Sequence, residues 1–208
     1  ARIEAGAVQR ARLLGRMLAD VYGAQRLLHD ALLPPTLLFR HKGYLRPLHG
    51  VMPVGGMHLH IVALDMARGP DGHWWVVSQR TQSPSGLGYV LHNRLIVSRL
   101  YPEAFRELRV QHIASSYRRL LDTVQQQAAD VAARLGNGHL PRIALLTPGP
   151  YSETYFEHAY LARYLGLSLV EGADLTARGD RLFLRTVEGL EPVHGVIRRL
   201  DDDYCDPL

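Results

Sequence analysis

A serine, a glycine and nearby basic residues in the middle of the chain are suited to binding an anion. Ser85 and Gly86 end the tripeptide Pro-Ser-Gly, and Asn93 and Arg94 follow downstream. A serine hydroxyl and a freely turning glycine can approach a carboxylate or a phosphate closely. An ordinary type II turn explains the same tripeptide. Arg94 and Arg99 are five residues apart, so a helix would align them only loosely. The stretch is a candidate anion-binding segment, with a plain turn as the alternative.

Charged residues near the end of the sequence offer a second candidate site. Arg198 and Arg199 precede a run of aspartates that starts at Asp201. The fork of an arginine side chain can bind two oxygens of a carboxylate or a phosphate. Adjacent arginines beyond a strand also pair commonly with neighbouring aspartates on a protein surface. A substrate site and a surface ion-pair cluster both stay open as interpretations.

Asp65 and Arg68 form a third candidate pair, near the end of an extended segment. Asp65 beside Arg68 could face a phosphate or a substrate. Charged residues at strand ends are more often solvated surface groups, so turn solvation is the alternative. The sequence alone does not decide between the two.

No metal site is predicted from the pattern of possible ligands. His58 and His60 would project to the same face of a strand, but two histidines without a third ligand are weak evidence for zinc. The sole cysteine, Cys205, can form neither an intramolecular disulfide nor a thiolate cluster within one chain. A reducing cytoplasm is therefore the expected location.

The sequence Thr-Pro-Gly-Pro, residues 147–150, lies between a predicted strand and a predicted helix. Open α/β sheets present a ligand crevice at this kind of position. The segment lacks the glycine fingerprint of dinucleotide sites and the lysine of a P-loop, so alone it predicts only a strand-to-helix turn. Glu157 and His158 follow in the helix and point to different sides, which argues against a paired acid-base device. We predict that Glu157 is a structural anchor.

Apolar spacing predicts the elements that position the first half of these residues. Helical spacing over residues 7–32 predicts two helices broken near Gly23, followed by a loop to about Gly56. Residues 58–66 and 73–79 are predicted strands, joined by a turn rich in Gly, Pro and Asp. The segment is therefore expected to contain a β-hairpin.

The second half of the sequence changes from helices to alternating strands and helices. A short helix is predicted around residues 89–96, before Pro102. A long amphipathic helix over residues 112–135 should end at Gly136 and cover a sheet. The spacing leaves the first of these helices less defined than the second.

The last third predicts a β-α-β unit followed by further strands. Residues 141–147 and 167–172 are predicted strands, and residues 152–166 form a helix with Ser152 as a candidate cap. A hairpin and another strand are predicted within residues 181–200. The fold class is therefore α/β, with a mixed sheet flanked by helices.

Composition limits the class of partner. The chain has 208 residues, is 47% hydrophobic and carries a formal net charge of +4, which suits one domain or two small lobes. Its arginines are scattered, so a nucleic-acid binder or a generic α/β scaffold rests on the basic pI alone and lacks aromatic-basic interleaving. No apolar stretch approaches a membrane span, and no signal peptide is evident. We expect no nucleic acid and no membrane as partners.

Two ordered blocks of sequence resemble a known family. The segments LLTPGPYSETYFEHAYLARYLGLSLVEGADL and VIRRLDDDYCDPL are similar to the signature of circularly permuted ATP-grasp proteins. The upstream segment DMARGPDGHWWVVSQRTQSPSGLGYVLHNRLIVSR resembles another block of the same family, so the resemblance extends from about Leu13 onward. The family is similar in fold to glutathionylspermidine synthase and to eukaryotic glutathione synthetase.

The resemblance implies a domain organisation. Residues 1–136 would be a helical segment and the hairpin portion of the ATP-grasp region, and residues 137–208 a pre-ATP-grasp-like α/β portion, together in one compact unit. The sequence opens directly into a helical pattern without an initiator methionine. In longer relatives the chain continues past a segment like the DDDYCDPL end into further ATP-grasp elements, so the resemblance implies an N-terminal fragment of a longer chain.

The resemblance also implies a chemistry. Such enzymes use ATP to activate a carboxylate as an acyl phosphate that an amine attacks, so ATP and Mg²⁺ are implied for the intact parent and are not expected to be held fully here. In catalytic members a Glu-Asp-Asn sequence after the second hairpin strand supplies magnesium ligands. The aligned residues here are Ser78, Gln79 and Arg80. A guanidinium brings positive charge and no acceptor, so it cannot replace a ligand to magnesium.

Two hypotheses follow. The chain is a fragment of an ATP-dependent amide or peptide ligase, inactive alone and acting on a small-molecule or peptide substrate; or it is a noncatalytic ATP-grasp-like module that binds a nucleotide, peptide or protein partner. Catalytic residues and the oligomeric state are left open. By the same resemblance, the Pro-Ser-Gly tripeptide is similar to the substrate loop of the family, Asp65 matches an acidic position, and relatives carry the Arg-Arg-x-Asp order near a substrate entrance. The candidates for substrate or nucleotide binding are Asp65, Arg68, Arg80, Ser85, Gly86, Asn93, Arg94, Arg198, Arg199 and Asp201.

Overall fold

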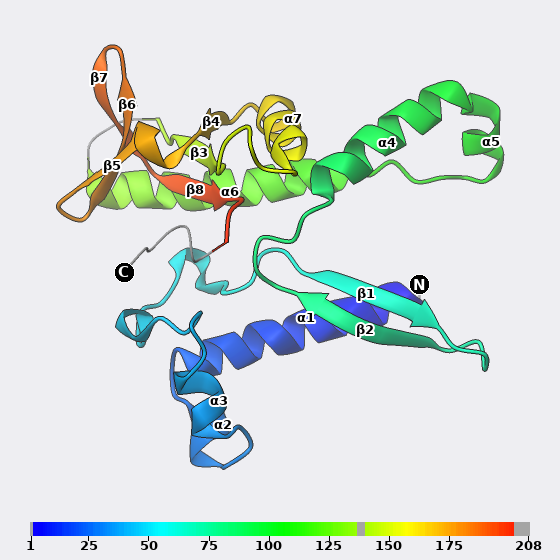
Figure 1. Ribbon diagram of the computed structural model, residues 1–208, viewed down its shortest axis with the longest axis horizontal. Helices are drawn as coiled ribbons and strands as arrows, with labels where there is room; N and C mark the ends of the chain where they lie inside the picture. The colour runs from blue at the N-terminus through cyan, green and yellow to red at the C-terminus, as the bar shows by residue number, and fades with distance from the viewer. Residues whose placement is uncertain (1, 137–139, 202–208) are drawn as a thin grey trace. The chain divides into compact units, whose positions relative to one another are not determined.

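A computed structural model describes residues 2–136 and 140–201 of the chain. The chain divides into two compact units, Ala1–Pro84 and Ser85–Leu208, which are described one at a time (Figure 1). The predicted α/β class is confirmed, since helices and strands occur in both units. The assignment of residues 1–136 and 137–208 to two portions of the family fold stays a prediction.

The first unit begins with a long helix and a tight break. Helix α1 (Arg2–Val21) starts earlier than predicted, and α2 (Arg26–His29) is a single turn. The predicted break near Gly23 is confirmed: a Cβ atom at this glycine would lie 2.6 Å from the carbonyl oxygen of Ala19. The Asp20 carboxylate accepts the backbone N–H groups of Arg26 and Leu27 and so caps the new helix.

The segment predicted as a loop contains three short helical turns. These are α3 (Pro35–Phe39), η1 (Arg46–Leu48) and η2 (Val54–Gly56). Pro35 is the first residue of α3, where its missing N–H costs nothing. Short turns of this kind escape a search for apolar periodicity because they span too few residues to show one.

The predicted hairpin is present, but its first strand starts later than expected. Strands β1 (Ala63–Arg68) and β2 (Trp74–Arg80) pair in antiparallel fashion. The pairing begins with Ala63 opposite Arg80, so the residues before Ala63 lie beyond the end of the partner strand. His58 and His60 are therefore not on a strand face, and that part of the prediction was wrong.

Three helices open the second unit. Helix α4 (Leu87–Leu100) is longer than predicted, and α5 (Pro102–Glu107) begins at the proline that was expected only to interrupt it. Helix α6 (Ala114–Leu135) ends as predicted at Gly136, which adopts a left-handed φ of 66°. None of the helices in the described parts of the chain has the length and apolar character that a membrane crossing needs.

The strands of the second unit lie in two separate sheets. Strands β3 (Ile143–Leu146), β4 (Ser168–Val170) and β8 (Gly195–Arg198) are parallel in the order β4-β3-β8. Helix α7 (Tyr155–Leu165) connects β3 to β4, which confirms the β-α-β unit. A short turn, η3 (Gly172–Asp174), leads into an antiparallel sheet of β5 (Leu175–Arg178), β6 (Arg181–Thr186) and β7 (Gly189–Val193), which includes the predicted hairpin.

The start of α7 differs from the prediction. Its N-cap residue is Thr154, which makes no side-chain cap bond, and the Ser152 hydroxyl instead accepts the Thr154 N–H. The loop after β3 continues through Ser152, so the helix starts two residues later than a serine cap would require.

Helices cover the parallel sheet, as expected. Helix α6 packs against β3 and β8, and α7 packs against β4 and α4 (Figure 1). A Cβ atom at Gly195 would lie 3.6 Å from the Ala128 side chain, so small residues allow α6 to approach β8 closely. Leu91, Leu145 and Leu161 belong to the buried core that joins α4, β3 and α7.

Replacing Leu91 tests this core. Its side chain is 1% exposed, so Leu91→Ala should lower the free energy of unfolding of the second unit by about 2–5 kcal/mol. The neighbouring Val90 is 52% exposed, so Val90→Ala should change it by no more than about 0.5 kcal/mol. Urea denaturation measures both, and equal losses would contradict the packing of α4.

Candidate functional site

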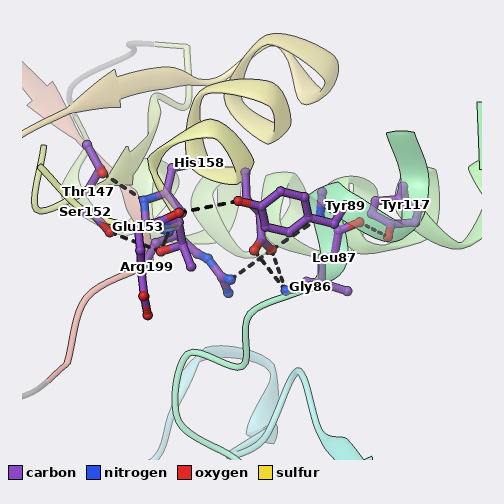
Figure 2. A network of polar contacts seen from close by, with 12 residues as sticks. Gly86, Leu87, Tyr89, Tyr117, Thr147, Ser152, Glu153, His158 and Arg199 are labelled. Carbon is purple, nitrogen blue, oxygen red and sulfur yellow. Dashed lines mark hydrogen bonds and ion pairs between the residues drawn. The ribbon is translucent and has the colours of Figure 1, made fainter. Parts of the chain in front are cut away.

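A buried carboxylate in the first turn of α7 organises the polar residues of the second unit. Glu157 is fully buried. Its carboxylate accepts the Gly86 N–H at 3.0 Å (Oε1) and 2.8 Å (Oε2), and Oε1 accepts the Gly88 N–H at 3.2 Å. Figure 2 shows the contacts around Gly86. The prediction that Glu157 is a structural anchor stands on these bonds, although the sequence did not indicate what it anchors.

These bonds satisfy the start of α4. The first N–H groups of a helix lack partners within the helix, and the N-terminus carries a partial positive charge. Gly86 is the N-cap residue of α4 and has no side chain with which to cap it. The carboxylate of Glu157 therefore caps α4 from another helix, and it fixes the backbone of the Pro-Ser-Gly segment at Gly86.

Two glycines make this approach sterically feasible. Gly86 has a φ of 111°, which residues with a Cβ atom rarely adopt. A Cβ atom at Gly88 would lie 2.7 Å from the Glu157 Cγ atom and 3.0 Å from the Glu157 carbonyl oxygen. A glycine is therefore required at Gly88 by the closeness of α7 and at Gly86 by the backbone conformation.

Arg199 completes the environment of the carboxylate. It follows β8, is 6% exposed, and its Nη2 atom lies 3.1 Å from Glu157 Oε1. Its backbone N–H donates to the Leu146 carbonyl at the end of β3. Burial lowers the pKa of Arg199, and the negative charge of Glu157 opposes that shift. Arg199, one of the two arginines considered as a surface pair, is thus a buried partner of Glu157.

We call Glu157, Arg199 and the amides of Gly86 and Gly88 the loop anchor.

Tyr117 holds the same helix start from α6. Its hydroxyl donates to the Leu87 carbonyl (Figure 2). Burial raises the pKa of Tyr117, and the charge of Glu157 adds to this effect. The first residues of α4 are therefore hydrogen-bonded from both α6 and α7.

His158 organises the loop after β3. Its Nδ1 atom is 2.8 Å from Thr147 Oγ1 and its Nε2 atom is 3.1 Å from Thr154 Oγ1. Thr147 Oγ1 also accepts the Gly149 N–H. Burial, and after it the charge of Arg199, lower the pKa of His158, while Glu157 opposes the shift. A neutral imidazole that links two threonines satisfies this arrangement.

In the first unit, Asp65 bonds to residues of the opposite strand. Arg80 Nη2 lies 2.8 Å from Asp65 Oδ1, and the Ser78 hydroxyl donates to Asp65 Oδ2. The bond from Ser78, and after it the charge of Arg80, lower the pKa of Asp65. Arg68 lies three residues along β1 from Asp65, on the other face of the strand, where its Nε atom donates to the Gly72 carbonyl in the turn. Asp65 is thus paired with Arg80 and is not beside Arg68.

Magnesium does not fit the end of this hairpin. Asp65 is the only carboxylate of the group and its two oxygens accept bonds from Ser78 and Arg80. Mg²⁺ requires several oxygen ligands, and Arg80 would repel it. Within residues 2–136 and 140–201, no group of three or more His, Cys, Asp or Glu side chains is placed to hold a metal ion.

The remaining candidate residues are described one by one. Arg94 Nη1 donates to the Gln111 carbonyl, and its guanidinium lies 5.9 Å from the centre of the Phe105 ring, so it braces the segment around α5. Asn93 and Asp201 are exposed, and Arg198 is the half-buried last residue of β8. Asp202, Asp203 and Cys205 lie outside the described residues.

Comparison with known proteins places the chain in a family. Residues 1–208 match the family model for circularly permuted ATP-grasp type 2. The chain belongs to the circularly permuted ATP-grasp type 2 family. The ATP-grasp family generally uses ATP and Mg²⁺.

Several relatives of this ATP-grasp chain are uncharacterised bacterial proteins. Identity is 41% over 206 residues with protein Rv2567 of Mycobacterium tuberculosis, 37% over 205 residues with sll0335 of Synechocystis, and 36% over 207 residues with Rv2411c of M. tuberculosis. The aligned regions cover 99%, 99% and 100% of this chain. The chain spans only 23%, 41% and 36% of these relatives' own lengths.

The loop anchor of this ATP-grasp chain brings together residues that sequence patterns kept apart. Gly86 and Arg199 were separate candidates, and both contact Glu157. Gly88 was not singled out, although a second glycine at the start of a helix was the available signal of close packing. The bond between Thr147 and His158 had no signal in the sequence, because it joins the loop after β3 to α7.

Removing the charge of Glu157 tests the loop anchor. Glu157→Gln removes the buried negative charge that pairs with the Arg199 guanidinium, so the free energy of unfolding should fall by about 3–5 kcal/mol. The exposed Glu153 provides a matched control, and Glu153→Gln should cost no more than about 0.5 kcal/mol. Denaturant titration of both variants measures the difference, and similar small losses would contradict the anchor.

The pH dependence of stability tests His158. Its folded-state pKa is below the ordinary 6.5, so the unfolded chain binds this proton at a higher pH than the folded chain does. The stabilisation from His158 is therefore complete above about pH 6.5 and is lost as the pH falls towards the lowered pKa. Denaturant titration from about pH 7.5 to about pH 5.5 should show a smaller loss of stability in His158→Gln than in the unsubstituted protein. Equal losses would contradict a buried neutral imidazole.

Proposed function

We propose that the protein to which this chain belongs is an ATP-dependent carbon-nitrogen ligase that joins a carboxylate to an amine through an acyl phosphate. Membership of the ATP-grasp family supports the reaction class. The chain spans about a quarter to two fifths of its relatives, which supports the further proposal that it is a fragment, inactive alone. Bound ATP would supply the phosphoryl group that activates the acid.

The observation that carries this proposal is the loop anchor. Glu157 fixes Gly86, while the neighbouring Ser85 is exposed. Because the Gly86 amide is already used by Glu157, Gly86 would shape the loop rather than donate to a ligand. The Ser85 hydroxyl is free of that constraint, and we propose that it binds the carboxylate of the substrate.

The topology of the parallel sheet supports a substrate position at its carboxyl edge. Strand β3 is central, and the chain leaves it through α7 to β4 on one side, while β8 pairs on the other side. Ligands of open α/β sheets bind where the strand order reverses in this way. The segment 147–150 and Arg199 follow β3 and β8 at that edge. We propose that a small-molecule or peptide acid approaches there, with Arg198 as a candidate partner for its charge.

One observation favours the noncatalytic alternative. Asp65, Ser78 and Arg80 bond to one another at the hairpin end, where magnesium does not fit. A module that binds a nucleotide, peptide or protein partner without catalysis needs no magnesium at that place. Measured turnover by the full-length protein distinguishes the ligase from the noncatalytic module.

ADP release by the full-length protein tests the ligase. We expect ADP only when both an acid and an amine substrate are present. Ser85→Ala should lower kcat/KM by roughly tenfold or more, the value of one hydrogen bond to a charged group. The exposed Ser115 on α6 is the matched control, and Ser115→Ala should leave kcat/KM unchanged. A folded, ATP-binding protein that releases no ADP with any acid and amine pair would support the noncatalytic alternative.

A further inference from the structure

One face of the β1-β2 hairpin carries a charged group that is separate from the loop anchor. We call Asp65, Ser78 and Arg80 the hairpin cluster. Asp65 pairs with Ser78 and Met66 pairs with Val76, so Val77 is an extra residue in β2. Alternate residues of a strand normally share a face, and a bulge changes the side on which the following residues lie. The bulge at Val77 therefore puts Ser78 on the same face as Asp65.

The hairpin cluster holds a guanidinium in a defined place. Arg80 lies opposite Ala63, two residues from Asp65 on the same face, and its Nη2 atom is 2.8 Å from Asp65 Oδ1. The lowered pKa of Asp65 agrees with an ionised carboxylate. The side chain of Arg80 remains 54% exposed. A guanidinium has five N–H donors, so donors remain for a second anion from solvent.

The same geometry excludes a divalent cation and offers a substitute for it. One carboxylate already neutralised by an arginine is a poor ligand set for Mg²⁺. A guanidinium fork, in contrast, binds two oxygens of a phosphate directly. The guanidinium of Arg80 thus supplies the positive charge that a metal ion would otherwise bring to a phosphate.

We propose that Arg80, held by Asp65, takes the place of a divalent cation at this end of the hairpin and binds the phosphate oxygens of an anionic ligand without magnesium. The proposal goes beyond ligation, since it describes how this chain holds an anion whether or not the whole protein catalyses a reaction. Asp65 and Ser78 act as positioning residues for the guanidinium.

Inorganic triphosphate is a suitable probe because it carries phosphate oxygens and nothing else. Calorimetric titration of the full chain should show binding in EDTA, and excess Mg²⁺, which itself complexes triphosphate, should not strengthen that binding. Arg80→Gln should weaken binding by roughly tenfold or more, the loss of a charge-assisted bond. The exposed Arg40 lies in the same unit, and Arg40→Gln removes the same charge without this effect.

A second variant reverses the proposed substitution. Ser78→Glu combined with Arg80→Asn supplies oxygen ligands in place of the guanidinium. This double variant should lose triphosphate binding in EDTA, recover it with Mg²⁺, and bind Mn²⁺ detectably by electron paramagnetic resonance.

The two titrations of the unsubstituted chain test the magnesium independence, and the Arg80→Gln titration tests the position of the site. Absence of triphosphate binding in EDTA, or binding that requires Mg²⁺, would overturn the proposal. Equal affinity of Arg80→Gln and the unsubstituted chain would overturn it too. Each of these results is distinct from the outcome of the ADP assay, which concerns turnover alone.

Discussion

A buried carboxylate must be compensated by neighbouring groups, and this requirement at Glu157 shapes the second unit. The compensation comes from two glycine amides at the start of α4 and from the Arg199 guanidinium. The carboxylate in turn stabilises each of these groups, because helix-start amides need hydrogen-bond acceptors and a buried guanidinium is stabilised by a negative charge. Helix α4, helix α7 and the end of β8 are thereby fixed to one another through a single side chain.

The local sequence around Gly86 follows from this requirement. Gly86 has the left-handed conformation and Gly88 allows the close approach of α7, so neither tolerates a larger residue. Ser85 is exposed beside them. A rigid backbone with one exposed hydroxyl is an economical way to present a polar group to a ligand, which is why the proposed function places the substrate carboxylate there.

Elements with a regular apolar period could be predicted from the sequence. Helix α6 ends at Gly136 and the β3-α7-β4 unit follows the expected order, because burial of one face leaves a repeating pattern. The start of β1 was misplaced, since its pairing is limited by the end of β2 rather than by its own residues. Ser152 was predicted as a cap because serine favours that position in general, and the longer loop after β3 overrides the preference.

The sequence indicated which residues have suitable chemistry, but it did not indicate which residues bond to one another. Arg80 was identified as a departure from a magnesium-ligand pattern, but its bond to Asp65 depends on a bulge that no local signal announced. Arg199 was expected beside aspartates, and its buried partner is 42 residues away in the sequence. The contact of Arg199 comes from the packing within the second unit, and that of Arg80 from the strand pairing of the hairpin; residue spacing encodes neither.

Amide hydrogen exchange at Gly88 tests the central claim most directly. An N–H group in the first turn of a helix has no partner within the helix and normally exchanges fast. If Glu157 accepts this N–H, the Gly88 amide should exchange as slowly as the amides in the core of the second unit. Glu157→Gln should accelerate exchange at Gly88 far more than exchange in the middle of α4. Rapid exchange at Gly88 in the unsubstituted protein, with the middle of α4 protected, would contradict the loop anchor.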